Sequence, residues 1–306
     1  MSSSPNASMR NTMVGLRALN TSPQVAPSKV AKKGPAGPAG KVDLVVRGDD
    51  DHRRPVFEQV AEEDDERATL APPPGHAEGS RRVPGEAFRR DAKGRPVPPC
   101  YGDVDQGNLA DAWLLASCAA VAHSLPAALV RRVRRRSPHD FAIDLGDDTV
   151  IVTSELSLEG YADPTPSGQA DTLWVALVEK AFAIREGGSY AHLETGNAAR
   201  ALEALTGQRA RRVSVTEHID AARLMKRLVE AKAKSLPMVL KTRSGSLSEP
   251  LVGDHNYAVL DVSAEALRIY NPWGTAGGTR PLEQMVHSIP VAQVLREVEA
   301  LYLCGA

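Results

Sequence analysis

The chain has 306 residues, of which 42% are hydrophobic and 25% charged, as is ordinary for a globular protein with room for one large or two smaller domains. Its formal net charge of −1 gives no general attraction to nucleic acid or to a membrane surface, and we expect neither as a partner. The 3 cysteines make no disulfide framework, and no apolar run reaches the roughly 18 residues of a membrane-spanning helix.

Residues 1–96 consist of Ser, Pro, Gly and charged clusters with almost no apolar periodicity. This composition buries too little apolar surface to offset chain entropy, so it predicts a disordered leader, with a regulatory or removable pro-region as the alternative. Within it, the short run Val42–Val46 could form an added strand. No apolar segment of a secretory signal is present near Met1, so we expect a cytoplasmic protein, with non-classical export left open.

A helix is predicted to begin near Asp111, where an apolar run at helical spacing starts. The residues expected on its buried side are Trp113, Leu114, Ala116, Ala120 and Val121. Its first residues lie where backbone N–H groups are unpaired and the helix dipole is positive. Such a position stabilises a thiolate and is therefore typical of a cysteine nucleophile.

Two further local patterns follow this helix. Pro126–Arg136 predicts a second helix with a solvated basic end, because no aromatic residues interleave the arginines as in a nucleic-acid surface. Phe141–Leu145 and Thr149–Glu155 are β-type runs separated by a Gly-Asp-Asp turn. They predict a β-hairpin.

The segment Leu173–Gly207 predicts an amphipathic helix, a Gly-rich loop and a second helix with Asn197 as its N-cap. Beyond it, Arg211–Val215 and Met238–Lys241 read as strands, and His218–Ala233 as a helix between them. The second half of the chain is therefore expected to be rich in strands.

Two polar residues lie at the ends of the next predicted strands. His255 opens an alternating strand, and Asn271 ends the run Leu267–Trp273. A tight turn near residues 263–266 makes the two strands antiparallel neighbours. We therefore expect His255 and Asn271 to lie within hydrogen-bond distance.

Three stretches together resemble the catalytic core of the calpain family of papain-like cysteine proteases. Gln106–Ala116 reads Q-G-N-L-A-D-A-W-L-L-A, against Q-G-x-L-G-D-C-W-L-L-A in that family. Leu173–Gly207 contains L-W-V-A-L-V-E-K-A-F, G-S-Y and A-L-E-A-L-T-G, which are similar to the family's second block. His255 and the N-P-W-G run at Asn271 resemble its third element.

The resemblance covers about residues 97–280 and implies an α+β fold, namely a two-lobed papain-like protease core at 97–306. Its helical lobe would span 97–207 and its antiparallel β lobe 208–306, with a cleft between them. The expected substrate is an extended peptide or protein segment, bound with weak side-chain preference.

The resemblance also implies roles for individual residues. Position 112 would hold the nucleophile, His255 would be its base, and Asn271 would fix the His tautomer. Gln106 would donate its side-chain NH2 to the developing oxyanion.

The residues expected to contact or shield a bound peptide are Trp113, Gly196 and Trp273. Gly196 would offer backbone hydrogen bonds to the substrate, while Thr195 replaces a second Gly of the family pattern. Trp273 would shield the His–Asn pair from water.

Calcium is the cofactor that the resemblance raises, and the sequence argues against it. Asp103 matches one acidic position of the family, but Thr172 stands at the second, and T-A-G-G-T follows Gly274 where a Glu is expected. Calcium needs several oxygen ligands. We expect the core calcium sites to be absent or weak, and no other cofactor.

Ala112 stands where the family has its nucleophilic Cys. The chain is then an inactivated form of a cysteine endopeptidase, a pseudoprotease that binds peptides or partners, or an enzyme with another nucleophile. For the third interpretation Cys118 is the nearby candidate, but six helical residues turn it about 120° away from position 112. It is expected to face the core.

Overall fold

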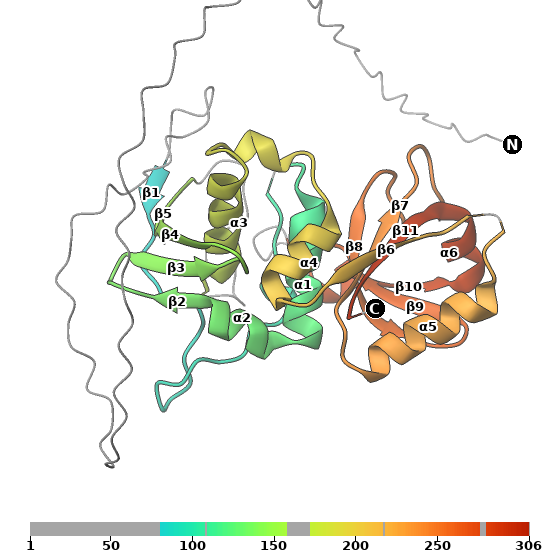
Figure 1. Cartoon of the computed structure of the whole chain (residues 1–306), viewed down its shortest axis with the longest axis horizontal. Helices are drawn as coiled ribbons and strands as arrows, with labels where there is room; N and C mark the ends of the chain where they lie inside the picture. The colour runs from blue at the N-terminus through green and yellow to red at the C-terminus, as the bar shows by residue number, and fades with distance from the viewer. Residues whose placement is uncertain (1–79, 108, 158–171, 217, 276–279, 306) are drawn as a thin grey trace, which may run out of the picture. The chain divides into compact units, whose positions relative to one another are not determined.

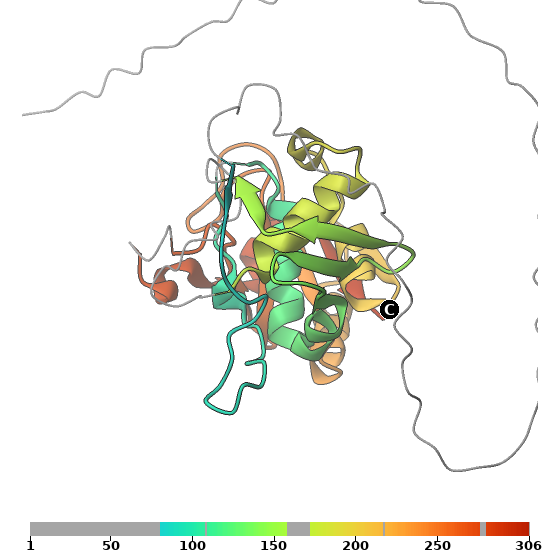
Figure 2. The same cartoon turned by 90° about the vertical axis from the view of Figure 1, so that its left-hand side faces the viewer.

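A computed structural model describes residues 80–107, 109–157, 172–216, 218–275 and 280–305. The helical lobe contains two small antiparallel sheets, β1-β5 and β2-β3-β4, beside its helices (Figures 1 and 2). Its elements are β1 Ser80–Arg82, the 3-10 helix η1 Tyr101–Asp103, α1 Ala112–Ser124, α2 Pro126–Arg132, β2 Val133–Arg135, β3 Asp140–Asp144, β4 Thr149–Thr153, β5 Glu155–Ser157, α3 Trp174–Arg185, the 3-10 helix η2 Tyr190–Leu193 and α4 Ala198–Thr206.

The second lobe is built on a six-stranded antiparallel sheet with the strand order β10-β9-β8-β7-β11-β6. Its elements are β6 Ala210–Ser214, α5 Ala221–Ala233, β7 Met238–Thr242, β8 Asn256–Val262, β9 Ala266–Tyr270, the 3-10 helix η3 Leu282–Met285, β10 Val286–Pro290, α6 Val291–Glu297 and β11 Val298–Cys304. These two lobes confirm the predicted α+β fold.

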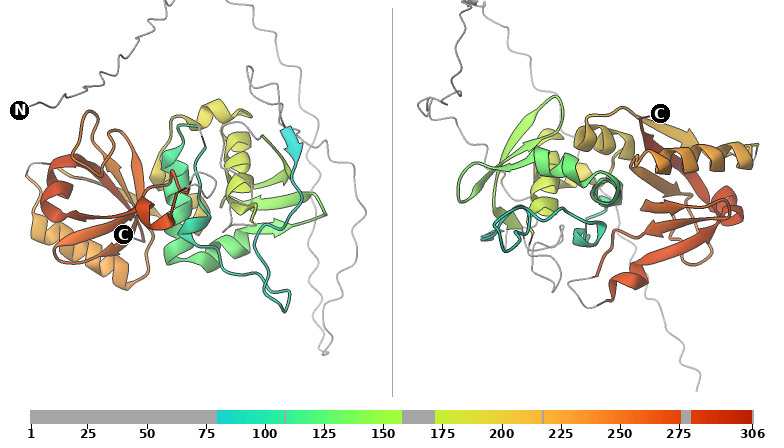
Figure 3. Two further views of the ribbon diagram at one scale, coloured as in Figure 1. Left: turned by 180° about the vertical axis from the view of Figure 1, so that it is seen from behind. Right: turned by 90° about the horizontal axis from the view of Figure 1, so that it is seen from below.

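Both faces of the sheet are buried, because successive side chains along a strand point into two different apolar clusters. Ala258 and Tyr270 belong to the cluster that includes α1 and α4, whereas Tyr257, Val259 and Ile269 belong to the cluster that includes α5 and α6. The first cluster is continuous with the helical lobe and joins the two lobes. Figure 3 shows α1 between them.

The helix α1 is buried from Ala112 to Ala122, not on one side only as its sequence pattern predicted. It contacts β7 and β8 as well as α2, α3 and α4, so it reaches solvent only in its last turn, at His123. Within the described residues, no single helix has the length and apolar character needed to cross a membrane; α1 and α2 pass that test only as a pair bent by 113°.

The predicted β-hairpin is present as β3 and β4, and the strand and helix patterns of the second lobe correspond to β6, α5 and β7. The helix expected over Pro126–Arg136 ends earlier, at Arg132. Its last residues form β2, because they pair with β3.

The folded core begins before residue 97, where the predicted leader was expected to end. Residues 80–82 pair with β5, and Val83, Ala87 and Phe88 are buried in the helical lobe. The Phe88 ring stacks on Trp174 at a centroid distance of 6.5 Å. The rest of the predicted leader, with its strand-like run at 42–46, lies outside the described residues.

Candidate active site

His255 precedes β8 and Asn271 follows β9, two neighbouring antiparallel strands. Both residues are buried, and Nε2 of His255 lies 3.0 Å from Oδ1 of Asn271. This is the hydrogen bond that the two adjacent strands predicted. It forms because the turn between β8 and β9 returns the chain beside itself.

The backbone of this pair is fixed from two further elements. The N–H of His255 donates to Oγ1 of Thr242 at 2.9 Å, and the N–H of Thr242 donates to the carbonyl of His255 at 2.9 Å. The N–H of Asn271 donates to the carbonyl of Met285 at 2.8 Å. The last residue of β7 and the last residue of η3 therefore hold the imidazole and the carboxamide in place.

The tautomer of His255 follows from the bonds to Asn271. Oδ1 of Asn271 also accepts the N–H of Trp273 at 3.1 Å, so it is the carbonyl oxygen and Nε2 of His255 must be the donor. The lone pair is then left on Nδ1. Burial lowers the pKa of His255, and the bond to Asn271 opposes that shift, so the imidazole is neutral at neutral pH and able to accept a proton.

Trp273 lies beside the imidazole, with its ring centroid 5.0 Å from that of His255. Its side chain is 39% exposed, whereas His255 is 6% exposed. The indole therefore separates part of the imidazole from solvent.

The segment before α1 is docked onto the end of β9. The backbone N–H of Gln106 donates to the carbonyl of Pro272 at 2.9 Å, and the Tyr270 hydroxyl donates to the carbonyl of Val104 at 2.6 Å. Gly274 fits against this segment with a φ of +62°, and a Cβ there would lie 2.6 Å from the Val104 oxygen. These contacts set Gln106 beside the end of β9, which Asn271 directly follows.

The side chain of Gln106 does not point into open space. Its Nε2 donates to the carbonyl of Leu109 at 2.7 Å and to Oδ1 of Asp111 at 3.2 Å. An amide nitrogen has two N–H donors, and these two bonds use both. The oxyanion role predicted for Gln106 would require its side chain to break one of these two bonds and donate to the substrate instead.

Ala112 is the first residue of α1, as predicted for the nucleophile position, and α1 packs against β8. Cys118 is fully buried. Burial raises the pKa of its thiol well above the usual range, and the charges of Asp111 and Glu179 add to this effect. Cys118 is therefore a core residue and not a replacement nucleophile.

Trp113 and Gly196 are in direct contact. The Trp113 indole is 6% exposed and its Nε1 donates to the carbonyl of Leu193 at 2.7 Å. A Cβ at Gly196 would lie 1.9 Å from Cε2 of that ring. Trp113, which was predicted to contact substrate, is thus a buried support beneath Gly196, while Gly196 itself is exposed.

Comparison with known proteins identifies the family of this chain. The family described as calpain family cysteine protease matches residues 100–279. This chain belongs to that family. It is 29% identical over 213 residues to Calpain-10 of Mus musculus and 28% identical over 200 residues to Calpain-9 of Homo sapiens.

The matched regions are a minor part of these calpains. They cover 58% and 56% of this chain, but 32% and 28% of Calpain-10 and Calpain-9. The Calpain-type cysteine protease DEK1 of Arabidopsis thaliana is 30% identical over 191 residues, which is 9% of its length.

The carboxylate of Asp103 is already engaged by other groups of the protein and does not fit the role of a calcium ligand. Its Oδ2 accepts the N–H of Cys100 at 2.9 Å and Nε1 of Trp174 at 3.1 Å, while Oδ1 accepts the Cys100 thiol and an Arg89 N–H. Thr172 is buried and brings no carboxylate. Within the described ranges no three acidic, His or Cys side chains are grouped as metal ligands require.

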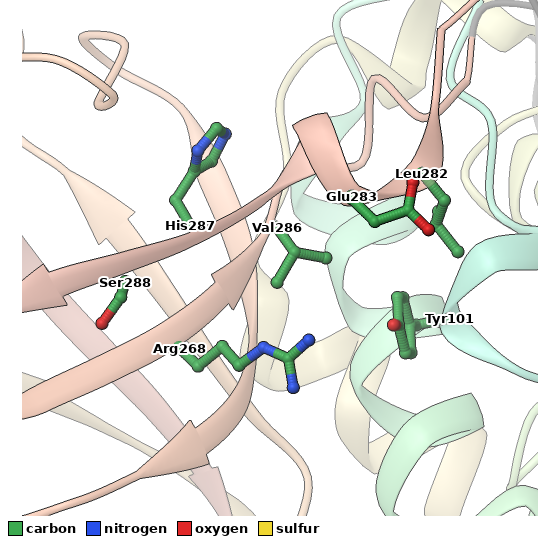
Figure 4. A pocket seen from close by; sticks show the side chains of 7 residues that line it. All are labelled: Tyr101, Arg268, Leu282, Glu283, Val286, His287 and Ser288. Atoms are coloured by element: carbon green, nitrogen blue, oxygen red, sulfur yellow. The ribbon is translucent and has the colours of Figure 1, made fainter.

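A pocket of about 330 Å³ lies between η1 and the strands β9 and β10 (Figure 4). Arg268 extends towards Tyr101 across it, and the remaining lining residues are Leu282, Glu283, Val286, His287 and Ser288. Its lining includes neither the His–Asn pair nor residue 112, so it is separate from both.

Two residues that position this site were not found from the sequence. Thr242 looks like any Thr ending a strand, and nothing local marks it. Glu179, which is buried on α3 and influences the pKa of Asp111, does carry a signal, because an acidic residue in the middle of a mostly apolar helix is rarely buried.

Proposed function

We propose that this chain carries the core of a calpain-type cysteine endopeptidase that acts through a Cys-His-Asn triad. As written it lacks the nucleophile, because position 112 is Ala. The proposal rests on the buried hydrogen bond between Nε2 of His255 and Oδ1 of Asn271 beside Trp273. That bond leaves a basic Nδ1 on an imidazole that burial keeps neutral.

With Cys at position 112, the chemistry follows from these roles. Nδ1 of His255 takes the thiol proton, and the thiolate attacks the peptide carbonyl to give a tetrahedral intermediate. The C–N bond breaks, the imidazolium returns the proton to the leaving amine, and a thioester remains. Water, deprotonated by the same Nδ1, then hydrolyses the thioester. Asn271 keeps the imidazole oriented throughout.

The proposed ligand is an extended peptide or protein segment that lies along the exposed backbone at Gly196. Neither nucleic acid nor membrane is proposed as a partner, and the proposed location is cytoplasmic.

A second candidate function is a pseudoprotease that binds peptides without cleaving them. Ala112 favours it, because a methyl group cannot attack a carbonyl. The helix α1 still begins at this position. This function needs the exposed backbone at Gly196 but not the base.

Casein hydrolysis by purified Ala112→Cys protein tests the first proposal. The variant should cleave casein, while the chain as written and Ala112→Cys/His255→Ala should not, since the base is lost in the latter. Iodoacetamide should label the thiol introduced at position 112 faster than that of Cys118, which is buried. A folded, inert Ala112→Cys protein that still captures a specific peptide would reject the peptidase and favour the pseudoprotease.

A further inference from the structure

The residues that lead into His255 form a short irregular segment before β8, here called the 250–254 turn. Asp254, the last residue of this turn, has a φ of +53°, which is the left-handed region that residues other than glycine seldom adopt. Such a conformation persists only where surrounding groups hold it in place. The contacts of the 250–254 turn therefore decide where the backbone of His255 begins.

Two buried hydroxyl groups hold both polar backbone groups of Val252, in the middle of this turn. The N–H of Val252 donates to the Tyr257 hydroxyl at 2.8 Å, and the Thr242 hydroxyl donates to the carbonyl of Val252 at 2.7 Å. Thr242 and Tyr257 have no exposed surface. They belong to the neighbouring strands β7 and β8, so the sheet fixes the turn from two of its strands.

The Thr242 hydroxyl links the turn directly to His255. Its oxygen accepts the N–H of His255 at 2.9 Å, and its one proton goes to Val252. The carbonyl of His255 lies farther from this hydroxyl, at 3.1 Å, and already accepts the N–H of Thr242. The backbone of His255 is thus tied to the turn as well as to β7.

Tyr257 also borders the imidazole of His255. The two ring centroids are 4.9 Å apart and the ring planes are perpendicular, while Trp273 is the second aromatic neighbour of the imidazole, at 5.0 Å. The mechanism proposed above gives Tyr257 no role. One side chain therefore contacts the catalytic ring with its own ring and holds the preceding turn with its hydroxyl.

We propose that Tyr257 and Thr242 are positioning residues for His255, and that they act through their hydroxyl bonds to Val252. By fixing the 250–254 turn, they keep Nε2 of His255 on Asn271. Loss of either hydroxyl leaves a backbone group of Val252 without its partner, so the turn moves to regain one and the imidazole loses its fixed orientation. The catalytic consequence rests on the proposed peptidase function, whereas the effect on the imidazole does not.

The first test uses the chain as written and needs no activity. NMR of 15N-labelled protein shows which ring nitrogen of His255 carries the proton, and His255→Ala assigns the signals by their loss. The unmodified chain should show the Nε2–H form, since Asn271 accepts that proton. Tyr257→Phe keeps the ring and should give a mixture of the Nε2–H and Nδ1–H forms. Tyr302→Phe, the same change at another buried tyrosine of the sheet, should not.

The two variants of Thr242 separate its hydroxyl from its shape. Thr242→Val keeps the shape and should give the same mixture of forms, whereas Thr242→Ser keeps the hydroxyl and should retain the Nε2–H form. A single Nε2–H form in folded Tyr257→Phe and Thr242→Val overturns the inference. Failure of Tyr257→Phe to fold overturns it too, because the hydroxyl would then support the whole lobe and not this turn.

The second test measures hydrolysis of fluorescein-labelled casein in the Ala112→Cys background. Adding Tyr257→Phe or Thr242→Val should lower kcat about tenfold or more and leave KM within about threefold, because the orientation of the base is used in the reaction and not in binding. Thr242→Ser should keep most of kcat. Unchanged kcat in both hydroxyl-free variants overturns the positioning role. Inactivity of Ala112→Cys itself counts against the peptidase proposal and leaves the NMR result to decide this one.

Discussion

Gly196 illustrates how a single residue is constrained by a neighbour on another element. The family pattern predicted a glycine whose backbone is open to a peptide, and residue 196 is exposed in the structure. The requirement for glycine comes from the other side, where the Trp113 indole occupies the space of a Cβ. Gly196 thus combines an exposed backbone with close packing against a buried ring.

Gly196→Ala should destabilise the protein by about 1–3 kcal/mol, because the added methyl overlaps a buried ring that is itself held by a hydrogen bond. Urea unfolding monitored by fluorescence measures this loss. Gly102→Ala is the control: its Cβ would crowd only the end of the Leu282 side chain, at 2.9 Å, which can rotate away, and Cys100 Sγ would lie at an ordinary contact distance of 3.8 Å. Equal losses in the two variants would contradict the explanation.

At the scale of one element, α4 has signals at both of its ends. The Asn197 side chain accepts the N–H of Ala199 at 2.9 Å, as predicted for an N-cap, and Gly207 ends the helix in the left-handed conformation. Its apolar residues Ala201, Leu202 and Leu205 are buried. These local signals explain why the sequence predicted this helix well.

Asn197→Ala should lower the free energy of unfolding by about 1 kcal/mol, because the first turn of α4 loses its side-chain acceptor. Asn197→Asp keeps an oxygen at the same place and should retain most of the stability. Thermal unfolding of the three proteins makes the comparison. Since residue 197 is exposed, a loss in Asn197→Asp as large as in Asn197→Ala would show that the cap is not the cause.

At the scale of the whole described molecule, the two lobes are joined at the segment before α1. The Tyr270 hydroxyl reaches the carbonyl of Val104 at 2.6 Å, and the Thr275 hydroxyl reaches Oδ2 of Asp105 at 3.0 Å. Both donors belong to the β lobe and both acceptors to the segment that leads to residue 112. The position of the His–Asn pair relative to α1 therefore depends on these bonds.

Tyr270→Phe should cost about 1–3 kcal/mol of stability, because the fully buried Val104 loses the hydroxyl that its carbonyl accepts. Chemical denaturation measures the effect. Tyr101→Phe is the matched control, since that neighbouring ring is only partly buried and packs edge-on against Tyr270 at 5.1 Å. A cost in Tyr101→Phe equal to that in Tyr270→Phe would mean that the hydroxyl bond is not what matters.

The sequence by itself determined the elements whose energetics are local. The β3–β4 hairpin, the cap of α4 and the closeness of His255 to Asn271 all depend on turns and strands only a few residues apart. Such features are encoded in short windows, because turn geometry and capping involve neighbouring residues. The family pattern added the position of residue 112 at the start of α1.

Only the tertiary structure decided which side chains are buried and what they face. Phe88 belongs to the core because Trp174 covers it, and the Gln106 amide is engaged because Asp111 accepts it. The pKa of Asp111 is raised because the surrounding core buries it, and Glu179 of α3 opposes that rise. Each partner except that of Gln106 lies more than about sixty residues away along the chain. Burial and the pKa of a carboxyl depend on these long-range contacts, which no local pattern in the sequence contains.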